Sequence, residues 1–413
     1  MIKDALILQK REFERKSKEF YVERDLRITG INSDLIHVAI GPRRAGKSFY
    51  LIHLLKDKHI GYVNFDDEFL LKVKNYQEIV DAVNQIYDHP KILLLDEIQN
   101  LRDWEVLVNR LQRQGYKLFI TGSNSKLLSS ELSTYLTGRH LLIRVFPFSF
   151  KEFLRSKKHE QLTKSEIKTF LMEYMESGGF PEVIVKEISP KEYLSLLVDS
   201  IIQKDIVQRY NIKYSAELKG LFLIIVTNFA NLLSLSKLKR LTQINSIHTI
   251  KNYLNYLEDA FLIFKVNHFS WKVKQQIMLP KKFYIIDSGI VHSKAFNFSS
   301  NYGRLMENLV ALQLLRNGEE FYYYKTKEGY EVDFVIKEGS KVKQLIQVTN
   351  INNLNELNHR EVRALLYAKT ELKCDNLLVI TWDYEGENEF SWFNKKGKIM
   401  FIPLWKWLLR INS

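Results

Sequence analysis

The sequence has little cysteine, proline and glycine, and no long run of apolar residues. Its single cysteine, Cys374, excludes a disulfide framework and a zinc site built from cysteines, and is typical of a reducing compartment. With 7 Pro and 17 Gly among 413 residues, a collagen-like or linker-dominated chain is excluded. Hydrophobic residues make up 46% of the chain, so we expect a globular protein of more than one domain.

Membrane segments are also missing from the sequence pattern. The longest apolar run, residues 221–229, is interrupted by polar residues, and it is far shorter than the roughly 20 residues that cross a bilayer. Residues 1–23 mix basic and acidic side chains without a continuous apolar core, so we expect no secretory signal in them. We therefore expect a cytoplasmic protein with no membrane partner.

Basic residues outnumber acidic ones, with 61 Lys+Arg against 48 Asp+Glu and a formal net charge of +13. A positive balance suits a polyanion such as nucleic acid, because Lys and Arg neutralise phosphates. Excess lysines on solvated faces explain the same number equally well. Charge alone therefore makes DNA a candidate partner and nothing more.

Short apolar segments alternate with helical patterns in the first third of the chain. A helix is predicted over residues 4–27, and strands are predicted at residues 36–40, 60–65, 91–95, 117–121 and 141–145. This alternation predicts an α/β domain with a parallel sheet covered by helices. The polar stretch 155–168 indicates a linker, which places the first domain at residues 1–160.

The segment after the first of these strands fits the P-loop pattern of Gly, four residues and Gly-Lys-Ser. Its glycines let the backbone wrap a phosphate, and the N-terminus of the following helix points at the anion. Lys47 is expected on the β- and γ-phosphates of ATP, and the Ser48 hydroxyl on Mg²⁺. The predicted ATP-binding residues are Gly41, Pro42, Arg43, Arg44, Ala45, Gly46, Lys47 and Ser48.

An acidic pair follows the apolar segment 91–95. Asp96 is expected to hold Mg²⁺ together with Ser48, and Glu97 to orient and deprotonate the attacking water. The alternative is an ordinary charged pair at a strand end. Combined with the P-loop, the pair predicts catalysis of ATP hydrolysis and not only nucleotide binding.

Two later positions are further candidates for the same reaction. Ser123, or its neighbour Asn124, would lie beside the γ-phosphate if the strand 117–121 is inserted between the P-loop strand and the Asp96 strand. A helix N-cap is an ordinary role for the same residues. Arg139 would serve either as an arginine finger toward a neighbouring subunit, which implies a homo-oligomer, or in a surface ion pair.

These motifs together resemble the archaeal and bacterial AAA+-type P-loop ATPases that carry a C-terminal domain of uncharacterised role. The resemblance implies ATP binding and hydrolysis, and it implies no particular substrate. It covers most of the chain and rests on residues 41–48, 95–99, 121–123, 146–150, 178–182, 204–206 and 284–289.

Residues 161–275 are predicted to be mainly helical. Between residues 236 and 266, a short helix, a turn, a longer helix and a strand follow one another, as in a winged helix-turn-helix. Such a unit either contacts DNA or only packs against its own ATPase domain or a partner. The residues predicted to face DNA are Asn245, His248, Lys251, Asn252 and Asn255, with Lys237, Lys239 and Arg240 near phosphates. Those predicted to face the core are Ile247, Ile250, Leu254 and Leu257.

Residues 276–413 return to an α/β pattern. Glu307 on a helix and Asp333 and Gln347 on successive strands resemble the restriction-endonuclease-like PD-(D/E)XK fold, whose active members use Mg²⁺. Gln347 and Thr349 replace the second acidic ligand and the lysine of that pattern. The open alternatives are a nuclease-like fold kept for binding, an active nuclease, and a plain hairpin with a solvated Asp333. The candidates for a replacement lysine are Lys325 and Lys343.

Three domains are therefore expected, at residues 1–160 (P-loop ATPase), 161–275 (helical lid and winged helix) and 276–413 (nuclease-like). The preferred hypothesis is a Mg²⁺-dependent ATPase that couples its nucleotide state to DNA binding or remodelling. One alternative is an ATP-gated switch that acts on a protein partner without DNA. The other is an ATP-regulated nuclease.

Overall fold

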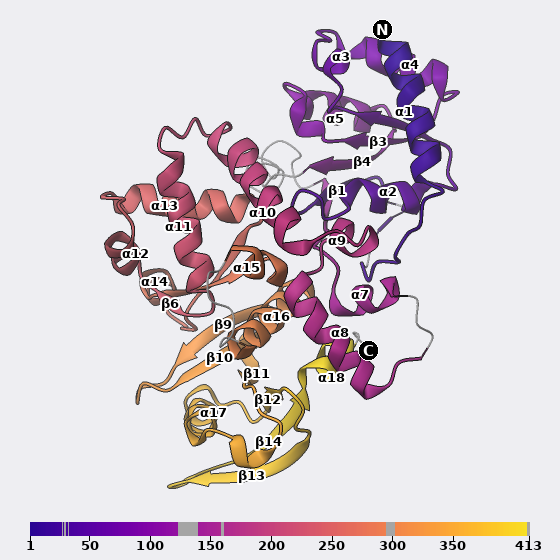
Figure 1. Cartoon of the computed structure of the whole chain (residues 1–413). Helices are drawn as coiled ribbons and strands as arrows, with labels where there is room; N and C mark the ends of the chain where they lie inside the picture. The colour runs from indigo at the N-terminus through magenta and orange to yellow at the C-terminus, as the bar shows by residue number, and fades with distance from the viewer. Residues whose placement is uncertain are drawn as a thin grey trace. The chain divides into compact units, whose positions relative to one another are not determined.

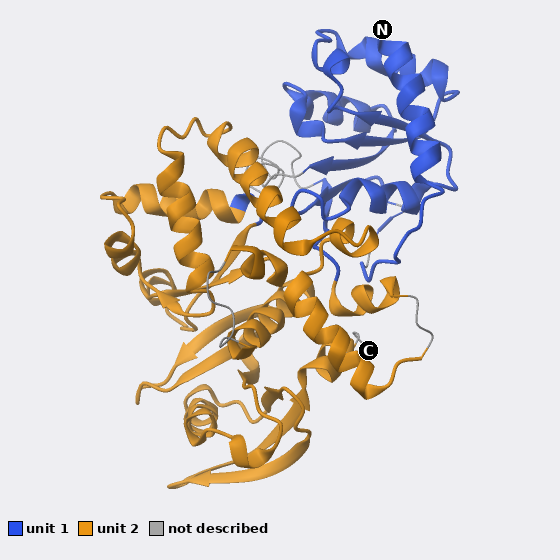
Figure 2. Ribbon diagram, viewed as in Figure 1, with its two compact units in different colours: residues 1–148, 259–261 blue, residues 149–258, 262–413 orange. Residues whose placement is uncertain are grey.

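The computed structural model describes residues 1–26, 28, 30–31, 33–122, 139–157, 161–294 and 302–410. The chain divides into two compact units, residues 1–148 with 259–261 and residues 149–258 with 262–413 (Figure 2). Within the described ranges, no helix has the length and apolar character needed to cross a bilayer. The division into three domains stays a prediction.

The first unit contains a parallel sheet with helices packed on it (Figure 1). Its five strands lie in the order β2-β3-β4-β1-β5, and all neighbouring strands are parallel. The predicted α/β P-loop fold class is thereby confirmed. The elements are α1 (Ile2–Lys16), β1 (Ile36–Ile40), α2 (Lys47–Leu55), β2 (Ile60–Asn64), α3 (Glu68–Leu71), α4 (Tyr76–Ile86), β3 (Ile92–Asp96), η1 (Ile98–Asn100), α5 (Trp104–Arg113), β4 (Lys117–Gly122) and β5 (His140–Arg144).

Strand β4 lies between β1, which leads into the P-loop, and β3, which ends at Asp96. Because the strands are parallel, their carboxyl ends meet at one edge of the sheet. This inserted strand is the arrangement that the sequence prediction for Ser123 required. The strand order thus brings the carboxyl ends of β1, β3 and β4 to the same edge of the sheet.

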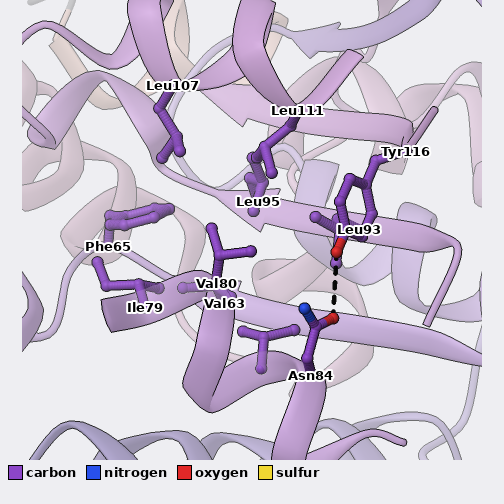
Figure 3. Close-up of a pocket in the computed structure, with 11 residues that line it drawn as sticks. Val63, Phe65, Ile79, Val80, Asn84, Leu93, Leu95, Leu107, Leu111 and Tyr116 are labelled. Carbon is purple, nitrogen blue, oxygen red and sulfur yellow. Dashed lines mark hydrogen bonds between the residues drawn. The ribbon is translucent and has the colours of Figure 1, made fainter. Parts of the chain in front are cut away.

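Side chains of the sheet alternate between two helical layers. On one face they meet α4 and α5 around a cavity of about 10 Å³, which is too small for a ligand larger than water (Figure 3). At its rim the Tyr116 hydroxyl donates a hydrogen bond to Asn84 Oδ1 at 3.1 Å. On the other face Tyr62 contacts Phe13 of α1, with ring centroids 5.6 Å apart. The apolar residues around the cavity are Val63, Phe65, Ile79, Val80, Val83, Leu93, Leu95, Leu107 and Leu111.

Helix α1 ends at Lys16, so the predicted helix over residues 4–27 is too long. Its buried face consists of Ala5, Leu6, Gln9 and Phe13, spaced one helical turn apart. The next position on that face is the half-exposed Ser17, so the apolar face that would continue the helix stops there. The alternating charges that suggested a longer helix do not provide a buried apolar face of this kind.

The predicted linker over residues 155–168 is also too long, because α7 (Phe150–Ser156) and α8 (Lys164–Ser177) occupy both of its ends. A capping box begins α8. The Glu166 amide donates to the Thr163 hydroxyl at 3.3 Å, and the Thr163 amide donates to the Glu166 carboxylate at 2.8 Å. This Thr-x-x-Glu pattern was the available sequence signal for the start of the helix.

The second unit contains an antiparallel sheet of order β6-β8-β7 and a mixed sheet of order β13-β14-β12-β11-β10-β9. It also contains a π-helical stretch, η3, which includes the predicted motif 204–206. Its remaining elements are α9 (Pro181–Val185), α10 (Pro190–Ile201), η3 (Ile202–Val207), α11 (Ser215–Thr227), β6 (Leu232–Leu233), α12 (Leu235–Leu241), α13 (Ile247–Asp259), β7 (Ile263–Val266), α14 (Val273–Met278), β8 (Lys281–Ile285), α15 (Ser288–Lys294), α16 (Tyr302–Arg316), β9 (Glu320–Lys325), β10 (Glu331–Glu338), β11 (Lys341–Val348), η4 (Leu354–Glu356), α17 (His359–Leu372), β12 (Leu377–Thr381), β13 (Gly386–Trp392), β14 (Lys395–Pro403) and α18 (Leu404–Leu409).

The mixed sheet has its own hydrophobic core. Val335, Leu345 and Val379 pack with Leu365 of α17 on one face. Phe334 points to the opposite face, where it contacts Tyr284 of β8 at 5.9 Å between ring centroids. Strand β10 therefore presents one face to α17 and the other to β8, and it is on this second side that the charged residues described below gather.

Two of the resemblance motifs, residues 178–182 and 284–289, meet inside the second unit. The buried Asp287 carboxylate accepts hydrogen bonds from the amides of Gly179 at 2.7 Å and Gly289 at 2.9 Å. A Cβ on Gly178 would lie 1.9 Å from Asp287 Oδ1, so the close approach requires glycine. Burial raises the pKa of Asp287 to about 6. These motifs therefore join the turn after α8 to the start of α15.

Candidate functional site

The P-loop connects β1 to α2 at the carboxyl edge of the sheet. Gly46 has φ +89° directly before the helix, and Gly41 has φ +153° directly after the strand. A Cβ on Gly41 would lie 1.9 Å from the carbonyl oxygen of Val145, so only glycine fits where the loop passes the segment after β5. Backbone contact thus dictates the first glycine of the motif.

Lys47 begins α2 and is only 4% exposed. Its ammonium donates hydrogen bonds to the carbonyl oxygens of Gly41 at 3.2 Å and Pro42 at 3.0 Å. The positive charge is therefore held against the loop itself. This is the position from which it can neutralise an anion bound at the start of the helix.

Arg24 braces the P-loop, and the sequence analysis did not find it. This residue is 9% exposed and donates hydrogen bonds to the carbonyl oxygens of Ala45, at 3.1 Å, and Phe146. Its guanidinium also lies 5.0 Å from the centre of the Phe148 ring. One side chain thus ties the loop to the segment after β5. A single arginine in a charged N-terminal region gives no local signal of such a role.

Asp96 accepts hydrogen bonds from three other segments of the first unit. Ser48 Oγ donates to Oδ1 at 2.7 Å, the Thr121 hydroxyl donates to the same oxygen, and the Tyr62 hydroxyl donates to Oδ2 at 3.1 Å. The carboxylate is 3% exposed. The start of α2 and strands β2 and β4 therefore converge on one buried acid at the end of β3. The contact of Tyr62 with Asp96 was not predicted, because nothing in the sequence of β2 indicates a polar partner for this hydroxyl.

Burial raises the pKa of Asp96, and the adjacent charge of Glu97 raises it further. The hydrogen bonds from Thr121, Ser48 and Tyr62 act in the opposite direction and favour the ionised form. All three donors are neutral hydroxyl groups. None of these three donors carries a charge, so a nearby cation would further favour the ionised form of Asp96.

Glu97 adopts a left-handed conformation with φ +50°. Its amide donates to Thr121 Oγ1 at 3.0 Å, and its carboxylate accepts a hydrogen bond from the Gln99 side chain. Non-glycine residues hold such a backbone only where the surroundings enforce it, often at functional sites. The Glu97 carboxylate thus contacts Gln99, whereas the Asp96 carboxylate contacts Ser48, Thr121 and Tyr62.

Two predicted residues remain, Ser123 and Arg139. Ser123, like Asn124, lies outside the described residues. Arg139 is exposed, and its carbonyl oxygen accepts a hydrogen bond from the Ile36 amide at 3.0 Å. Ile36 begins β1, so Arg139 lies at the opposite end of that strand from the P-loop of its own chain. Its role toward a neighbouring subunit stays a prediction.

A second charged group, in the second unit, includes the predicted Glu307 and Asp333. The lysine between them is Lys282 of β8, whose ammonium lies 2.8 Å from Glu307 Oε1 and 3.1 Å from Asp333 Oδ1. The two lysines proposed from the sequence are not there. Lys325 is exposed at the end of β9, and Lys343 is 46% exposed and pairs with Glu338. The sequence signal for Lys282 was a lysine directly before the apolar residues of β8.

Burial and neighbouring charges shift the pKa values of the residues in this group. Burial, followed by the charge of Asp333, raises the pKa of Glu307 to about 7. Burial by itself would lower the pKa of Lys282, but the surrounding acids outweigh it and raise that pKa well above the usual value. Lys282 is therefore a permanent cation at neutral pH.

The surface of α12 and α13 is mostly as predicted. Ile250, Leu254 and Leu257 are buried. Ile247 was predicted to face the core, but it is 42% exposed because it lies in the first turn of α13, before the packed part of the helix. The predicted DNA-facing residues that are exposed are Lys239, Arg240, Asn245, His248, Lys251 and Asn255. Asn252 and Lys237 are half-buried.

Comparison with known proteins places these observations in a family. Residues 33–154 match an AAA domain, and residues 168–301 and 302–407 match two domains of unknown function, DUF8612 and DUF4143. An uncharacterized protein of Methanocaldococcus jannaschii is 38% identical over 433 residues, which covers 98% of this chain and 95% of the relative. An uncharacterized protein of Haemophilus influenzae is 30% identical over 392 residues, which covers 91% and 95%.

Among solved structures, the chain is similar to the Walker-type ATPase of Pyrococcus abyssi, with 14% identity and a TM-score of 0.43. The match covers 69% of this chain and 95% of the Pyrococcus chain. The sequence relatives match over nearly their whole length. The chain belongs to the same family as these archaeal and bacterial proteins, and its N-terminal part is an AAA-type P-loop ATPase domain.

Proposed function

We propose that this chain binds Mg-ATP at the P-loop and hydrolyses it. The observation that carries the proposal is the 2.7 Å hydrogen bond from Ser48 Oγ to Asp96 Oδ1 at the edge of the sheet where Lys47 also lies. A hydroxyl and a carboxylate are the oxygen ligands that Mg²⁺ takes in nucleotide sites. Burial raises the pKa of Asp96, and a cation beside the carboxylate would offset this effect by favouring the ionised form. These residues fit Mg²⁺.

In this proposal each residue has one task. The backbone of residues 41–48 holds the phosphates, and Lys47 neutralises their charge. Ser48 and Asp96 hold Mg²⁺, which supplies charge neutralisation at the phosphate oxygens when it is bound. Glu97 accepts a proton from the attacking water. Ser123 contacts the γ-phosphate, and Arg139 acts in the site of a neighbouring subunit.

We further propose that nucleotide state is coupled to DNA through a winged helix at residues 232–285. The order β6, α12, α13, β7, β8 and the sheet order β6-β8-β7 support this assignment. The exposed basic residues Lys239, Arg240 and Lys251 support contact with phosphates. Polar side chains beside them, such as His248 and Asn255, suit contact with base edges.

A second candidate is an ATP-gated switch that binds a protein partner through the connection between β7 and β8. Five large apolar side chains there are exposed: Trp271 by 59%, Val273 by 66%, Ile277 by 67%, Met278 by 72% and Leu279 by 37%. Exposed apolar side chains gathered in one short segment are typical of protein contacts and not of phosphate contacts. This observation favours the switch over DNA binding at that segment.

The first prediction concerns Lys47. Lys47→Ala removes the charge that neutralises the phosphates, so ATP turnover falls by roughly two orders of magnitude or more. The matched control is Lys56→Ala, an exposed lysine at the end of the same helix, which keeps the parent rate. Phosphate release measures both. A Lys47→Ala protein that turns over ATP as fast as the parent contradicts the site.

The second prediction concerns Tyr62. Tyr62→Phe removes the hydrogen bond to Asp96 Oδ2, so the Mg²⁺ concentration needed for half-maximal turnover rises about 10-fold. Tyr87→Phe is the control, because the buried Tyr87 hydroxyl donates to the Tyr62 carbonyl oxygen at 3.1 Å and not to Asp96. Equal Mg²⁺ requirements in the two variants would mean that Tyr62 does not orient a metal ligand.

The third prediction separates the two candidates for coupling. If α12 and α13 contact phosphates, binding of labelled duplex DNA weakens steeply with salt, and Lys251→Gln lowers the slope of log K against log salt by about 1. Lys219→Gln, on the exposed side of α11, leaves the slope unchanged. Absence of DNA binding at low salt would favour the protein switch.

A further inference from the structure

The buried cluster around Lys282 belongs to the second unit, whereas the residues assigned to ATP belong to the first. Lys282 is 1% exposed, and its ammonium contacts three carboxylates. The distances are 2.7 Å to Glu331 Oε1, 2.8 Å to Glu307 Oε1 and 3.1 Å to Asp333 Oδ1. An ammonium group has three N–H donors, so each of these carboxylates can receive one. The lysine comes from β8, and the acids come from α16 and β10.

The carboxylates have further partners besides the lysine. The Tyr284 hydroxyl donates to Glu307 Oε1 at 2.6 Å, and the Val348 amide donates to Asp333 Oδ2 at 3.0 Å. Glu307 and Asp333 therefore each receive a second hydrogen bond within the fold. The cluster is a completed network, which is the condition under which buried charges are tolerated.

The Mg²⁺ that the nuclease resemblance implies does not fit these residues. Mg²⁺ requires oxygen ligands at about 2.0–2.1 Å and Ca²⁺ at about 2.3–2.6 Å, whereas here the oxygens converge at 2.7–3.1 Å on a nitrogen. Within the described ranges, no group of three or more His, Cys, Asp and Glu side chains is suited to a metal ion. Gln347 adds no ligand, because its side-chain oxygen accepts from the Asp333 amide at 3.4 Å.

We propose that Lys282 is a built-in replacement for the divalent cation of a nuclease-like site. Its single positive charge offsets part of the negative charge of Glu307, Glu331 and Asp333 and locks β8 to α16 and β10, and the cluster neither binds Mg²⁺ nor cuts nucleic acid. An active-site lysine must reach substrate and water, whereas this ammonium is enclosed by protein. The inference is independent of the ATPase proposal, since it concerns a separate set of residues.

The proposal has a consequence for the chain without the lysine. One ammonium faces three carboxylates, so removing it leaves a concentrated negative charge in a buried place. Such a group either binds a cation from solution or destabilises the fold. Lys282→Ala should therefore create a divalent-metal site that the parent chain lacks.

The test uses the full chain, without nucleotide, in an Asp96→Asn background so that the ATPase domain contributes no metal signal. Manganese binding is followed by electron paramagnetic resonance. We expect no bound Mn²⁺ at the cluster in this background at millimolar concentrations. A Mn²⁺ ion that is bound here and lost on Asp333→Asn would overturn the proposal, as would Mn²⁺-dependent DNA cleavage lost in the same variant.

The second arm adds Lys282→Ala and measures melting temperature with and without Mn²⁺. We expect a lower melting temperature than the parent, partly restored by Mn²⁺, and one ion bound per chain. Lys281→Ala is the control, because that neighbouring lysine is half-buried and its ammonium donates to Asn267 Oδ1 at 2.7 Å. An unchanged melting temperature, or a folded Lys282→Ala chain that binds no Mn²⁺, would overturn the proposal.

A third variant covers the case in which Lys282→Ala does not fold. Lys282→Met with Glu307→Gln and Asp333→Asn removes the lysine and its two buried acids together while it keeps side-chain volume, and Glu331, whose side chain is 31% exposed, keeps its charge. If the lock acts through charge neutralisation, this chain melts above the single Lys282→Met variant. A triple variant that melts no higher than the single one contradicts that mechanism.

Discussion

The first unit depends on the hydrogen bonds that the buried carboxylate of Asp96 accepts. Three hydroxyl groups from three other elements donate to it, and each reaches it only because the parallel strands end at the same edge. A change in strand order would remove Thr121 or Ser48 from its reach. The local positions of the P-loop, the Glu97 turn and β4 are thus linked through one side chain.

The two acidic centres of this chain differ in what satisfies them. Asp96 is supported by neutral donors, which leaves its negative charge for a cation. Glu307 and Asp333 already share the ammonium of Lys282, whose pKa is raised well above its usual value. Buried acids in the two units therefore have different partners: neutral hydroxyl groups donate to Asp96, whereas an ammonium group already contacts Glu307 and Asp333.

The sequence predicted most of the parts whose signal is local. The apolar strands, the P-loop and the Asp96–Glu97 pair follow from patterns within a few residues, and the sheet confirmed the fold class. The predicted end of the first helix at residue 27 was wrong because charge alternation was taken as helical, whereas α1 ends at Lys16 and its buried face ends after Phe13. Local sequence patterns therefore predict whether a segment forms a helix or a strand better than they predict where that element ends.

Other residues have roles that no local pattern contains. Arg24 reaches Phe146, 122 positions away, and Lys282 reaches Asp333, 51 positions away. Such contacts exist only after the chain has folded, so single-sequence inspection placed the replacement lysine at 325 or 343 instead. The one usable signal for Lys282 was its position next to the apolar residues of β8, where a buried lysine needs a partner.

The central claim is that Asp96 links nucleotide to Mg²⁺, and calorimetric ATP binding by the full chain tests it most directly. In the parent, Mg²⁺ should tighten ATP binding relative to EDTA. In Asp96→Asn, ATP should bind as in the parent with EDTA, and Mg²⁺ should add little. An equal effect of Mg²⁺ in both proteins, or no ATP binding by the parent, would contradict the account.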